Sequence, residues 1–147
     1  NDILRGGQGN DTLAGAFGAD TLSGDMGADV LRGAAGADIF VFTSGSTPLG
    51  DPGLDMIADF ENGFDRFDIG FNVNAVLQGS RQTSLSTAQK AAQLLFDERA
   101  GTGEVAVFTV GRDSYLFFSG TGGNEVDSAI QLSGFTQATG IGTNDFV

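Results

Sequence analysis

Four copies of a nine-residue repeat fill residues 6–41 and constrain the fold more than any other feature of the chain. The copies read GGQGNDTLA, GAFGADTLS, GDMGADVLR and GAAGADIFV. Glycine stands at positions one and four of every copy, aspartate at position six, and a large apolar residue at position eight. Residues 1–5, NDILR, supply positions five to nine of an earlier copy, so we expect the chain to be a fragment of a longer protein.

Each position of the repeat has a physical role. Glycine at positions one and four permits backbone angles with positive φ and lets the carbonyl groups of the turn point toward one place. Positions seven to nine predict a short strand whose middle side chain points inward. Two repeats then complete one coil, so loops 18 residues apart lie above one another. The predicted core residues are Leu4, Leu13, Leu22, Leu31 and Phe40. The predicted aspartate pairs are Asp2 with Asp20, Asp11 with Asp29, and Asp20 with Asp38.

The charge of the chain is concentrated in the part that contains the repeats. The net charge is −12, and 12 of the 19 acidic residues lie in residues 1–70. This balance argues against nucleic acid or an anionic membrane as a partner and suits hard cations; the alternative, which composition alone favours, is a solvated acidic face. No apolar stretch approaches the roughly 20 residues of a membrane span, so we expect a membrane to matter only in transit.

A stack of aspartates repels itself unless a cation neutralises it. Calcium takes six to eight oxygen ligands, carboxylates and backbone carbonyls together, whereas magnesium demands a tighter octahedron. We therefore predict about three calcium ions between the turns. The predicted carboxylate ligands are Asp2, Asp11, Asp20, Asp29 and Asp38. The predicted carbonyl ligands come from Gly6, Gln8, Asn10, Gly15, Phe17, Ala19, Gly24, Met26, Ala28, Gly33, Ala35 and Ala37. The alternative is that the aspartates only cap turns.

The repeats resemble the RTX nonapeptide GGxGxDxUx, in which U is a large apolar residue. The resemblance implies a right-handed parallel β-roll with calcium between its turns. The sequence departs from the pattern at position two, where Ala16, Asp25 and Ala34 replace glycine. We expect an all-β fold with one helix, in which an antiparallel β cap follows the roll. We also expect residues 1–147 to form a single C-terminal domain. Its residues 1–42 would be the calcium-binding roll, and its residues 43–147 the capping and secretion part.

The segment DMIADFENGFDRFDIG, residues 55–70, extends the resemblance. It is similar to the segment that follows the roll in serralysin-type proteases, in alginate epimerase R-modules and in many type I secretion substrates. The resemblance implies that Asp55, Asp59 and Asp65 make further calcium or turn contacts. It also implies that Phe60, Phe64 and Phe67 plug the open end of the roll. The last residues, 144–147, resemble the C-terminal element of such secretion substrates.

The rest of the chain predicts one helix and three strands. Residues 84–100 have apolar side chains at helical spacing, with a capping box at Ser86 and Gln89 and Gly101 after the end. We place the helix at about 86–100 and expect it to cover the roll. The predicted strands are 104–110, 114–119 and 128–132, in an antiparallel sheet that continues the roll. Residues 121–127 are interpreted as a polar turn, with one more cation site at Glu125 and Asp127 as the alternative. The dipeptide Asp51-Pro52 is also interpreted as a turn, with self-cleavage as the alternative.

The chain contains no His and no Cys, which excludes the common catalytic triads and thiolate metal sites. We therefore expect no catalytic constellation here, although the parent protein can be an enzyme through a passenger domain N-terminal to this fragment. The predicted function is a calcium-binding roll that folds on export through a type I secretion apparatus and stabilises a secreted, extracellular protein. The alternatives are an adhesin or surface anchor and a carbohydrate-binding module. The latter usually requires a basic groove or exposed aromatic residues, and Tyr115 is the only Tyr.

Overall fold

The computed structural model describes residues 1–43, 49, 53–98, 103–119 and 125–147, and it has two β-sheets, one α-helix and two short 3-10 helices. One sheet has four strands in the order β1-β3-β5-β7, and the other has seven in the order β2-β4-β6-β11-β10-β9-β8. The strands of the first are β1 (Ile3–Gln8), β3 (Thr21–Met26), β5 (Ile39–Val41) and β7 (Arg66–Asp68). Those of the second are β2 (Thr12–Ala14), β4 (Val30–Arg32), β6 (Asp55–Ile57), β8 (Ala75–Gln78), β9 (Glu104–Val110), β10 (Asp113–Phe118) and β11 (Ser128–Leu132).

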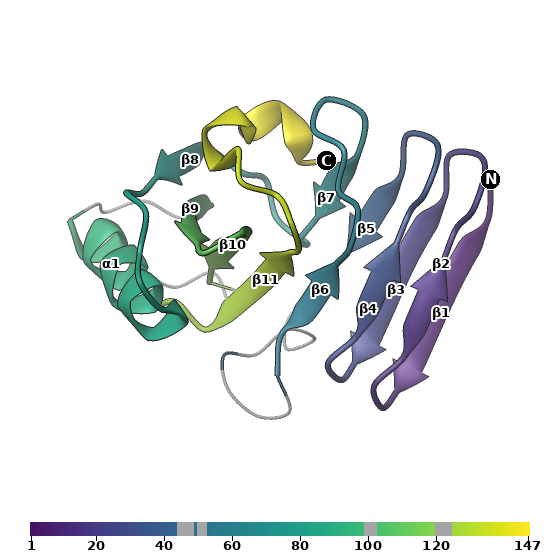
Figure 1. The fold of residues 1–147 in the computed structure, drawn as a ribbon, viewed down its shortest axis with the longest axis horizontal. Helices are drawn as coiled ribbons and strands as arrows, with labels where there is room; N and C mark the ends of the chain where they lie inside the picture. Colours follow the sequence, from purple (N-terminus) through teal and green to yellow (C-terminus); the bar gives the residue numbers. More distant parts are fainter. Residues whose placement is uncertain (44–48, 50–52, 99–102, 120–124) are drawn as a thin grey trace.

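Residues 1–41 form a parallel β-roll in which successive strands alternate between the two sheets (Figure 1). Leu4 pairs with Leu22, Leu13 with Leu31, and Leu22 with Phe40, so every pair within the repeats is separated by 18 residues. The predicted coil length is confirmed. β2, β4 and β5 have the predicted bounds, whereas β1 and β3 start at the predicted residue and continue three residues farther, to Gln8 and Met26. The fold as a whole is mostly β with one helix, as expected.

The segment after the repeats adds one more level to the roll. β6 pairs in parallel with β4, and β7 pairs in parallel with β5. The offsets are 26 residues (Val30 with Met56) and 27 residues (Ile39 with Arg66) because residues 42–54 intervene before β6. For this segment we predicted calcium or turn contacts and aromatic residues that plug the end of the roll, but no further strands of the roll.

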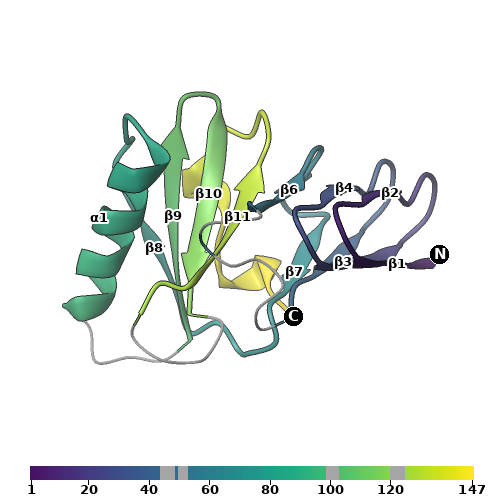
Figure 2. The same ribbon diagram turned by 90° about the horizontal axis from the view of Figure 1, so that it is seen from below.

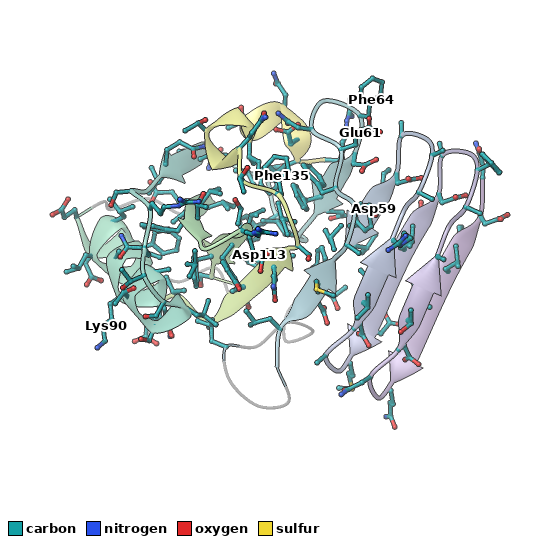
Figure 3. All side chains as sticks on the ribbon, in the orientation of Figure 1. Asp59, Glu61, Phe64, Lys90, Asp113 and Phe135 are labelled. Carbon is teal, nitrogen blue, oxygen red and sulfur yellow. The ribbon has the colours of Figure 1, made fainter. Side chains whose placement is uncertain are left out.

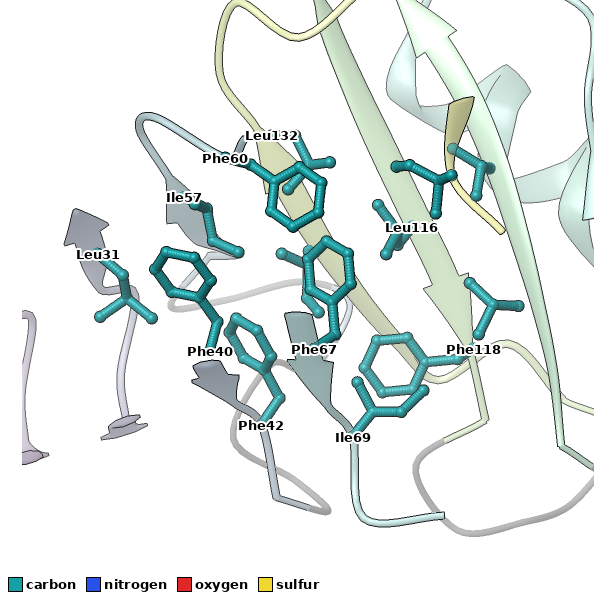
Figure 4. Close-up of a cluster of buried hydrophobic side chains, with 14 of the residues drawn as sticks. Leu31, Phe40, Phe42, Ile57, Phe60, Phe67, Ile69, Leu116, Phe118 and Leu132 are labelled. Carbon is teal, nitrogen blue, oxygen red and sulfur yellow. The ribbon is translucent and has the colours of Figure 1, made fainter. Parts of the chain in front are cut away.

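A continuous apolar core runs from the roll into the cap (Figure 4). Leu22, Leu31 and Phe40 are fully buried, whereas Leu4 and Leu13, at the N-terminal end of the roll, are only partly buried. Phe60 and Phe67 stack with ring centroids 4.4 Å apart, which confirms two of the three plug residues. The third assignment is wrong. Phe64 is 62% exposed because it lies on the β6–β7 loop, where its side chain points away from the sheets (Figure 3).

The cap is an antiparallel meander of β9, β10 and β11 that continues the second sheet of the roll. The junction is parallel, since Ile130 of β11 pairs with Asp55 of β6. β8 also joins β9 in parallel, so the cap is not purely antiparallel. Both faces of β9 and β10 are buried, as their apolar sequences predict.

The helix α1 (Leu85–Asp97) covers the cap rather than the roll, which corrects the prediction. Figure 2 shows it beside β8 and β9, on the far side of the cap sheet from the roll. Its buried residues, Ala88, Ala92 and Phe96, pack against a second core that contains Phe108 and Phe117. No helix among the described residues is long and apolar enough to cross a membrane.

The start of α1 also differs from the prediction. The N-cap is Ser84, and the capping box joins it to Thr87, not Ser86 to Gln89. The C-cap is Glu98, and Gly101 lies outside the described residues. Asp51-Pro52 and most of the predicted turn at 121–127 also lie outside them.

The last residues return to the roll. Two 3-10 helices, η1 (Ala138–Gly140) and η2 (Thr143–Asp145), precede a β-bridge between Phe146 and Phe67. The two rings lie 5.3 Å apart, and the Val147 amide donates to the Phe67 carbonyl at 3.0 Å. The terminal element therefore packs on β7, at the level that closes the roll.

Candidate calcium sites

The aspartates at position six form two ladders, one on each side of the roll. One carboxylate oxygen of each aspartate accepts a hydrogen bond from the backbone N–H of the aspartate one coil earlier. The bonds are Asp2 N to Asp20 Oδ1 (2.6 Å), Asp11 N to Asp29 Oδ1 (2.8 Å), Asp20 N to Asp38 Oδ1 (2.8 Å), Asp29 N to Asp55 Oδ1 (2.9 Å) and Asp38 N to Asp65 Oδ1 (3.0 Å). The predicted pairs therefore lie together, and Asp55 and Asp65 extend the two ladders beyond the repeats.

The second oxygen of most ladder aspartates is buried and has no hydrogen-bond partner among the described residues. These orphaned atoms are the Oδ2 oxygens of Asp11, Asp20, Asp29, Asp38 and Asp55. Buried polar atoms are almost always hydrogen-bonded, and a charged one without a partner is costly. Five such atoms at equivalent positions indicate that a ligand outside the polypeptide satisfies them.

The glycine at position one shows where the free oxygens point. A Cβ atom at Gly6 would lie 2.7 Å from Asp11 Oδ2 and 2.7 Å from the carbonyl oxygen of Gly24. On the other side of the roll, a Cβ at Gly15 would lie 2.5 Å from Asp20 Oδ2 and 3.0 Å from the Gly33 carbonyl oxygen. A carboxylate and a carbonyl from the next coil thus converge on one small space that any side chain would fill. This combination of oxygens is the one that calcium prefers.

Carboxylates alone do not complete a metal site here. No three acidic side chains gather at one place in the part of the chain that the structure describes. The remaining ligands of a calcium ion would therefore be backbone carbonyls of the turns, as the sequence predicts. Two of the predicted carbonyls also accept backbone hydrogen bonds between coils, Met26 from Gly9 and Ala35 from Gly18, both at 2.9 Å.

Asn10 acts through its side chain as well as its backbone. Its Oδ1 accepts a hydrogen bond from Ala28 N at 3.0 Å, and Asn1 makes the same contact to Ala19 at 2.9 Å. Position five therefore links neighbouring loops wherever it is asparagine. The prediction for Asn10 named its backbone carbonyl and missed this side-chain hydrogen bond. The recurrence of asparagine at position five, at Asn1 and Asn10, could have indicated it.

Asp59 and Asp65 differ from the other predicted acidic ligands because hydrogen bonds use both of their oxygens. Asp59 accepts from Gly33 N at 3.1 Å and from Ala34 N at 3.0 Å. Asp65 accepts from Glu61 N at 2.8 Å in addition to its ladder bond. Of the two roles that the resemblance allowed, the geometry favours turn contacts for Asp59 and Asp65. Figure 3 shows Asp59 and Glu61 on the loop between β6 and β7.

Burial affects the pKa of the last aspartate of each ladder, at the end next to the cap. Asp55 is fully buried, and this desolvation raises its pKa from 3.8 to about 7, although the hydrogen bond from Asp29 N opposes the shift. Burial also raises the pKa of Asp65. At the other end, the chain's first amino group lies 3.5 Å from Asp20 Oδ1. A cation at Asp55 would compete with the proton that burial favours.

Position two of the repeat adopts positive φ whether or not it is glycine. The φ angle is 98° at Gly7, 76° at Ala16, 64° at Asp25 and 69° at Ala34. The departures from glycine at this position therefore leave the turn geometry intact and place three L-residues in a left-handed conformation.

The repeats match the family model of the RTX calcium-binding nonapeptide repeat (4 copies), over residues 1–31 and 15–46. Residues 1–46 are RTX calcium-binding repeats. These residues contain the five strands β1 to β5, the glycines at position one and the aspartates Asp2 to Asp38 of the two ladders. The roll extends beyond the matched residues, since β6 and β7 add a level that the family model does not cover.

Solved structures similar to the chain include two epimerase subunits and a lipase. The AlgE6R3 and AlgE6R2 subunits of the Azotobacter vinelandii mannuronan C5-epimerase are 24% and 22% identical, with TM-scores of 0.40 and 0.43. The chain is covered to 99% in both comparisons and spans 77% and 90% of those subunits. The extracellular lipase LipA from Serratia marcescens is 19% identical over 99% of the chain, with a TM-score of 0.48, and the chain spans 20% of its length. No curated protein matches the chain.

Proposed function

We propose that this chain is a calcium-dependent folding domain that supports the export and the stability of a secreted protein. The observation that carries the proposal is the set of five buried carboxylate oxygens without a partner. Each such atom costs free energy in the folded chain, by about 1–3 kcal/mol for a neutral group and more for a charged one. Calcium converts this cost into a gain, because its binding energy becomes folding energy.

The residues proposed to hold calcium lie between successive coils. On one side of the roll they are Asp11, the carbonyl of Gly24 and Asp29, and the next level places Asp29 beside Asp55. The other side offers Asp20, the carbonyl of Gly33 and Asp38. These three positions account for about three ions, with carbonyls of the turns completing six to eight ligands at each.

Export gives this dependence a function. Where calcium is scarce, the aspartates repel one another and the glycine-rich repeats lose much conformational entropy on folding, so the roll stays unfolded. An unfolded chain can thread a type I secretion apparatus. Outside the cell, calcium at the 10⁻⁴–10⁻³ M levels that extracellular modules bind folds the roll. The domain then stabilises a passenger located N-terminal to it. We propose no catalytic role for this chain, which has neither His nor Cys.

The folding half of the proposal is tested by titrating the chain with calcium and following β-structure by far-UV circular dichroism. We expect a cooperative gain of β signal with calcium, little response to magnesium, and a blunted response in the Asp20→Ala/Asp29→Ala variant. Equal β signal in chelator and in calcium would show that the aspartates are only structural turn residues.

The export half needs a separate test. The chain, fused behind a reporter passenger, is expressed in a bacterium that carries a type I apparatus, with and without residues 42–147. We expect the reporter in the medium only with the complete chain. Equal release without residues 42–147 would remove the secretion role and leave calcium-dependent folding unaffected.

A further inference from the structure

The chain has one Asn-Gly dipeptide, Asn62-Gly63, which lies in the loop between β6 and β7. Both residues are exposed. Glu61 and Phe64, which flank the dipeptide, are labelled on this loop in Figure 3. The space around Gly63 is open, because a Cβ atom there would meet no described atom of a non-adjacent residue within 4 Å. Solvent therefore reaches the dipeptide.

An Asn-Gly pair can modify itself without an enzyme. The backbone nitrogen of the glycine attacks Cγ of the asparagine and closes a succinimide ring, and the side-chain nitrogen takes up the proton of the glycine N–H and leaves as ammonia. Water then opens the ring at either carbonyl and gives aspartate or isoaspartate. The net change is one water consumed and one ammonia released. Glycine favours the reaction because it has no side chain beside the attacking nitrogen and has a freely rotating backbone.

The folded turn points the attacking nitrogen away from its target. The Phe64 N–H donates to the Glu61 carbonyl at 3.1 Å. Gly63 has a φ of 82°, whereas the φ of Asn62 is not positive. Positive φ at the third residue alone is typical of a type II turn, in which the second residue has a ψ of about +120°. At that angle the Gly63 nitrogen lies next to the Cα–H bond of Asn62 and not next to its Cβ, so the ring cannot close unless the turn opens.

Hydrogen bonds hold this turn and the leaving group in place. The Asp65 N–H donates to the Glu61 carbonyl at 2.9 Å. The Asp65 carboxylate accepts from the Glu61 N–H at 2.8 Å and from the Asp38 N–H at 3.0 Å. Asn62 Nδ2 donates to the Gly140 carbonyl at 3.2 Å and so connects the loop to η1. The ring can therefore close only after the loop has left this geometry.

We infer that Asn62-Gly63 is a self-modification site that is open in the unfolded chain and closed in the folded one. Conversion of Asn62 adds a negative charge to a chain of net charge −12. The product has an acceptor oxygen where the amide donated to the Gly140 carbonyl, so this hydrogen bond is lost. Isoaspartate also inserts one carbon into the backbone of the turn that positions Asp65. The inference does not depend on calcium, because it compares folded and unfolded chains however folding is driven.

Trypsin makes the reaction measurable at this residue alone. Cleavage after Arg32 and Arg66 releases residues 33–66, in which Asn62 is the only residue with a side-chain amide. The complete chain is incubated at mildly alkaline pH in saturating calcium, with and without urea above its unfolding midpoint. Circular dichroism confirms the folded and unfolded states. Mass spectrometry of the peptide detects the conversion of amide to acid, and chromatography separates aspartate from isoaspartate.

We expect conversion in urea and conversion at least about tenfold slower in the folded chain, because the folded chain reacts only through its open form. In urea, Gly63→Ala is expected to slow the reaction, since the added methyl group shields the attacking nitrogen. Equal rates with and without urea would overturn the protection by the turn. An amide that stays intact in urea would overturn the site itself.

The Asn62→Asp variant carries one of the two products and tests the lost contact. In saturating calcium its urea midpoint is expected to lie below that of the parent chain, because its side chain cannot donate to the Gly140 carbonyl. The matched control is Asn72→Asp, the same charge change at another exposed asparagine, which is expected to keep the parent midpoint. Equal midpoints for the two variants would refute the proposed consequence of the modification.

Discussion

Replacing Asp29 with asparagine separates the two roles of the ladder within one residue. Asp29 Oδ1 holds the N–H of Asp11 at 2.8 Å, whereas its Oδ2 is buried without a partner. The Asp29→Asn substitution keeps an oxygen that can accept the hydrogen bond from Asp11 N. It removes the negative charge that the proposed calcium site uses. Because Asp29 stands between Asp11 and Asp55, the change affects two of the proposed calcium positions at once.

The expected effects have opposite signs with and without calcium. In chelator, removing a buried unpaired charge stabilises the folded state by about 1–3 kcal/mol. In calcium at 100 times Kd, each occupied site contributes about 2.7 kcal/mol, so weakening both removes up to roughly 5 kcal/mol. The variant is therefore expected to fold more readily than the parent chain without calcium and to be less stable with it.

Two measurements by circular dichroism cover both conditions. In chelator, a protecting osmolyte such as TMAO drives folding, and the variant is expected to need less of it. In saturating calcium, urea unfolds the chain, and the variant is expected to have the lower midpoint. Asp97→Asn, the same change at an exposed helix position, serves as the control. A destabilisation of equal size in both conditions would refute the reasoning, because it would mean that Asp29 acts only as a hydrogen-bonding turn residue.

Three further predictions concern the ladders and the glycine-rich turns between them. The pKa of Asp55 is about 7 in the folded chain, against an ordinary value of 3.8. Protonation of Asp55 therefore stabilises the calcium-free fold, fully below pH 3.8, and this stabilisation is lost as the pH rises through about 7. Osmolyte midpoints in chelator across this range should show the loss, and Asp55→Asn should flatten it. Ala16→Gly relieves a φ of 76° and is expected to raise the urea midpoint in calcium by an amount equivalent to about 0.5–1 kcal/mol; a lower midpoint would contradict this. Gly24→Ala places a Cβ against the Asp29 carboxylate and is expected to abolish the calcium response in the dichroism titration. Gly142→Ala, at a glycine with a φ of −132° and open space around it, should keep that response.

The strictly periodic part of the fold is predictable because each position of the repeat has one physical role. Eight glycines and four aspartates in register determine the coil, the strands and the aspartate pairs. The next level of the roll is not predictable in this way. Residues 42–54 break the 18-residue period, so the pairing of Val30 with Met56 depends on how that segment closes and not on a repeat.

The remaining errors arise where several residues have the same local chemistry. Ser84, Ser86 and Thr87 can each begin a helix, and the cap falls on Ser84 because its side chain reaches the Thr87 amide. Phe64 and Phe67 have the same hydrophobicity, yet Phe64 lies on a loop and Phe67 on a strand. At the candidate site, the sequence predicts which aspartates lie next to each other. It does not predict that one carboxylate oxygen accepts a hydrogen bond from the neighbouring coil while the other has no hydrogen-bond partner.

In the proposed calcium-bound roll, the two oxygens of each ladder aspartate would couple calcium binding to backbone geometry. Each repeat contributes one large apolar side chain to the core, partly buried at Leu13 and fully buried in the other three, while it orders nine residues, at least two of which are glycine. Packing alone therefore provides little stability. A ligand at Oδ2 fixes the aspartate side chain, and the fixed side chain presents Oδ1 to the N–H of the preceding coil. Occupation of one level therefore supports the next level toward the N-terminus. The cap shares one apolar core with the roll and has a second core of its own, so it provides the stable end against which the coils of the roll can order.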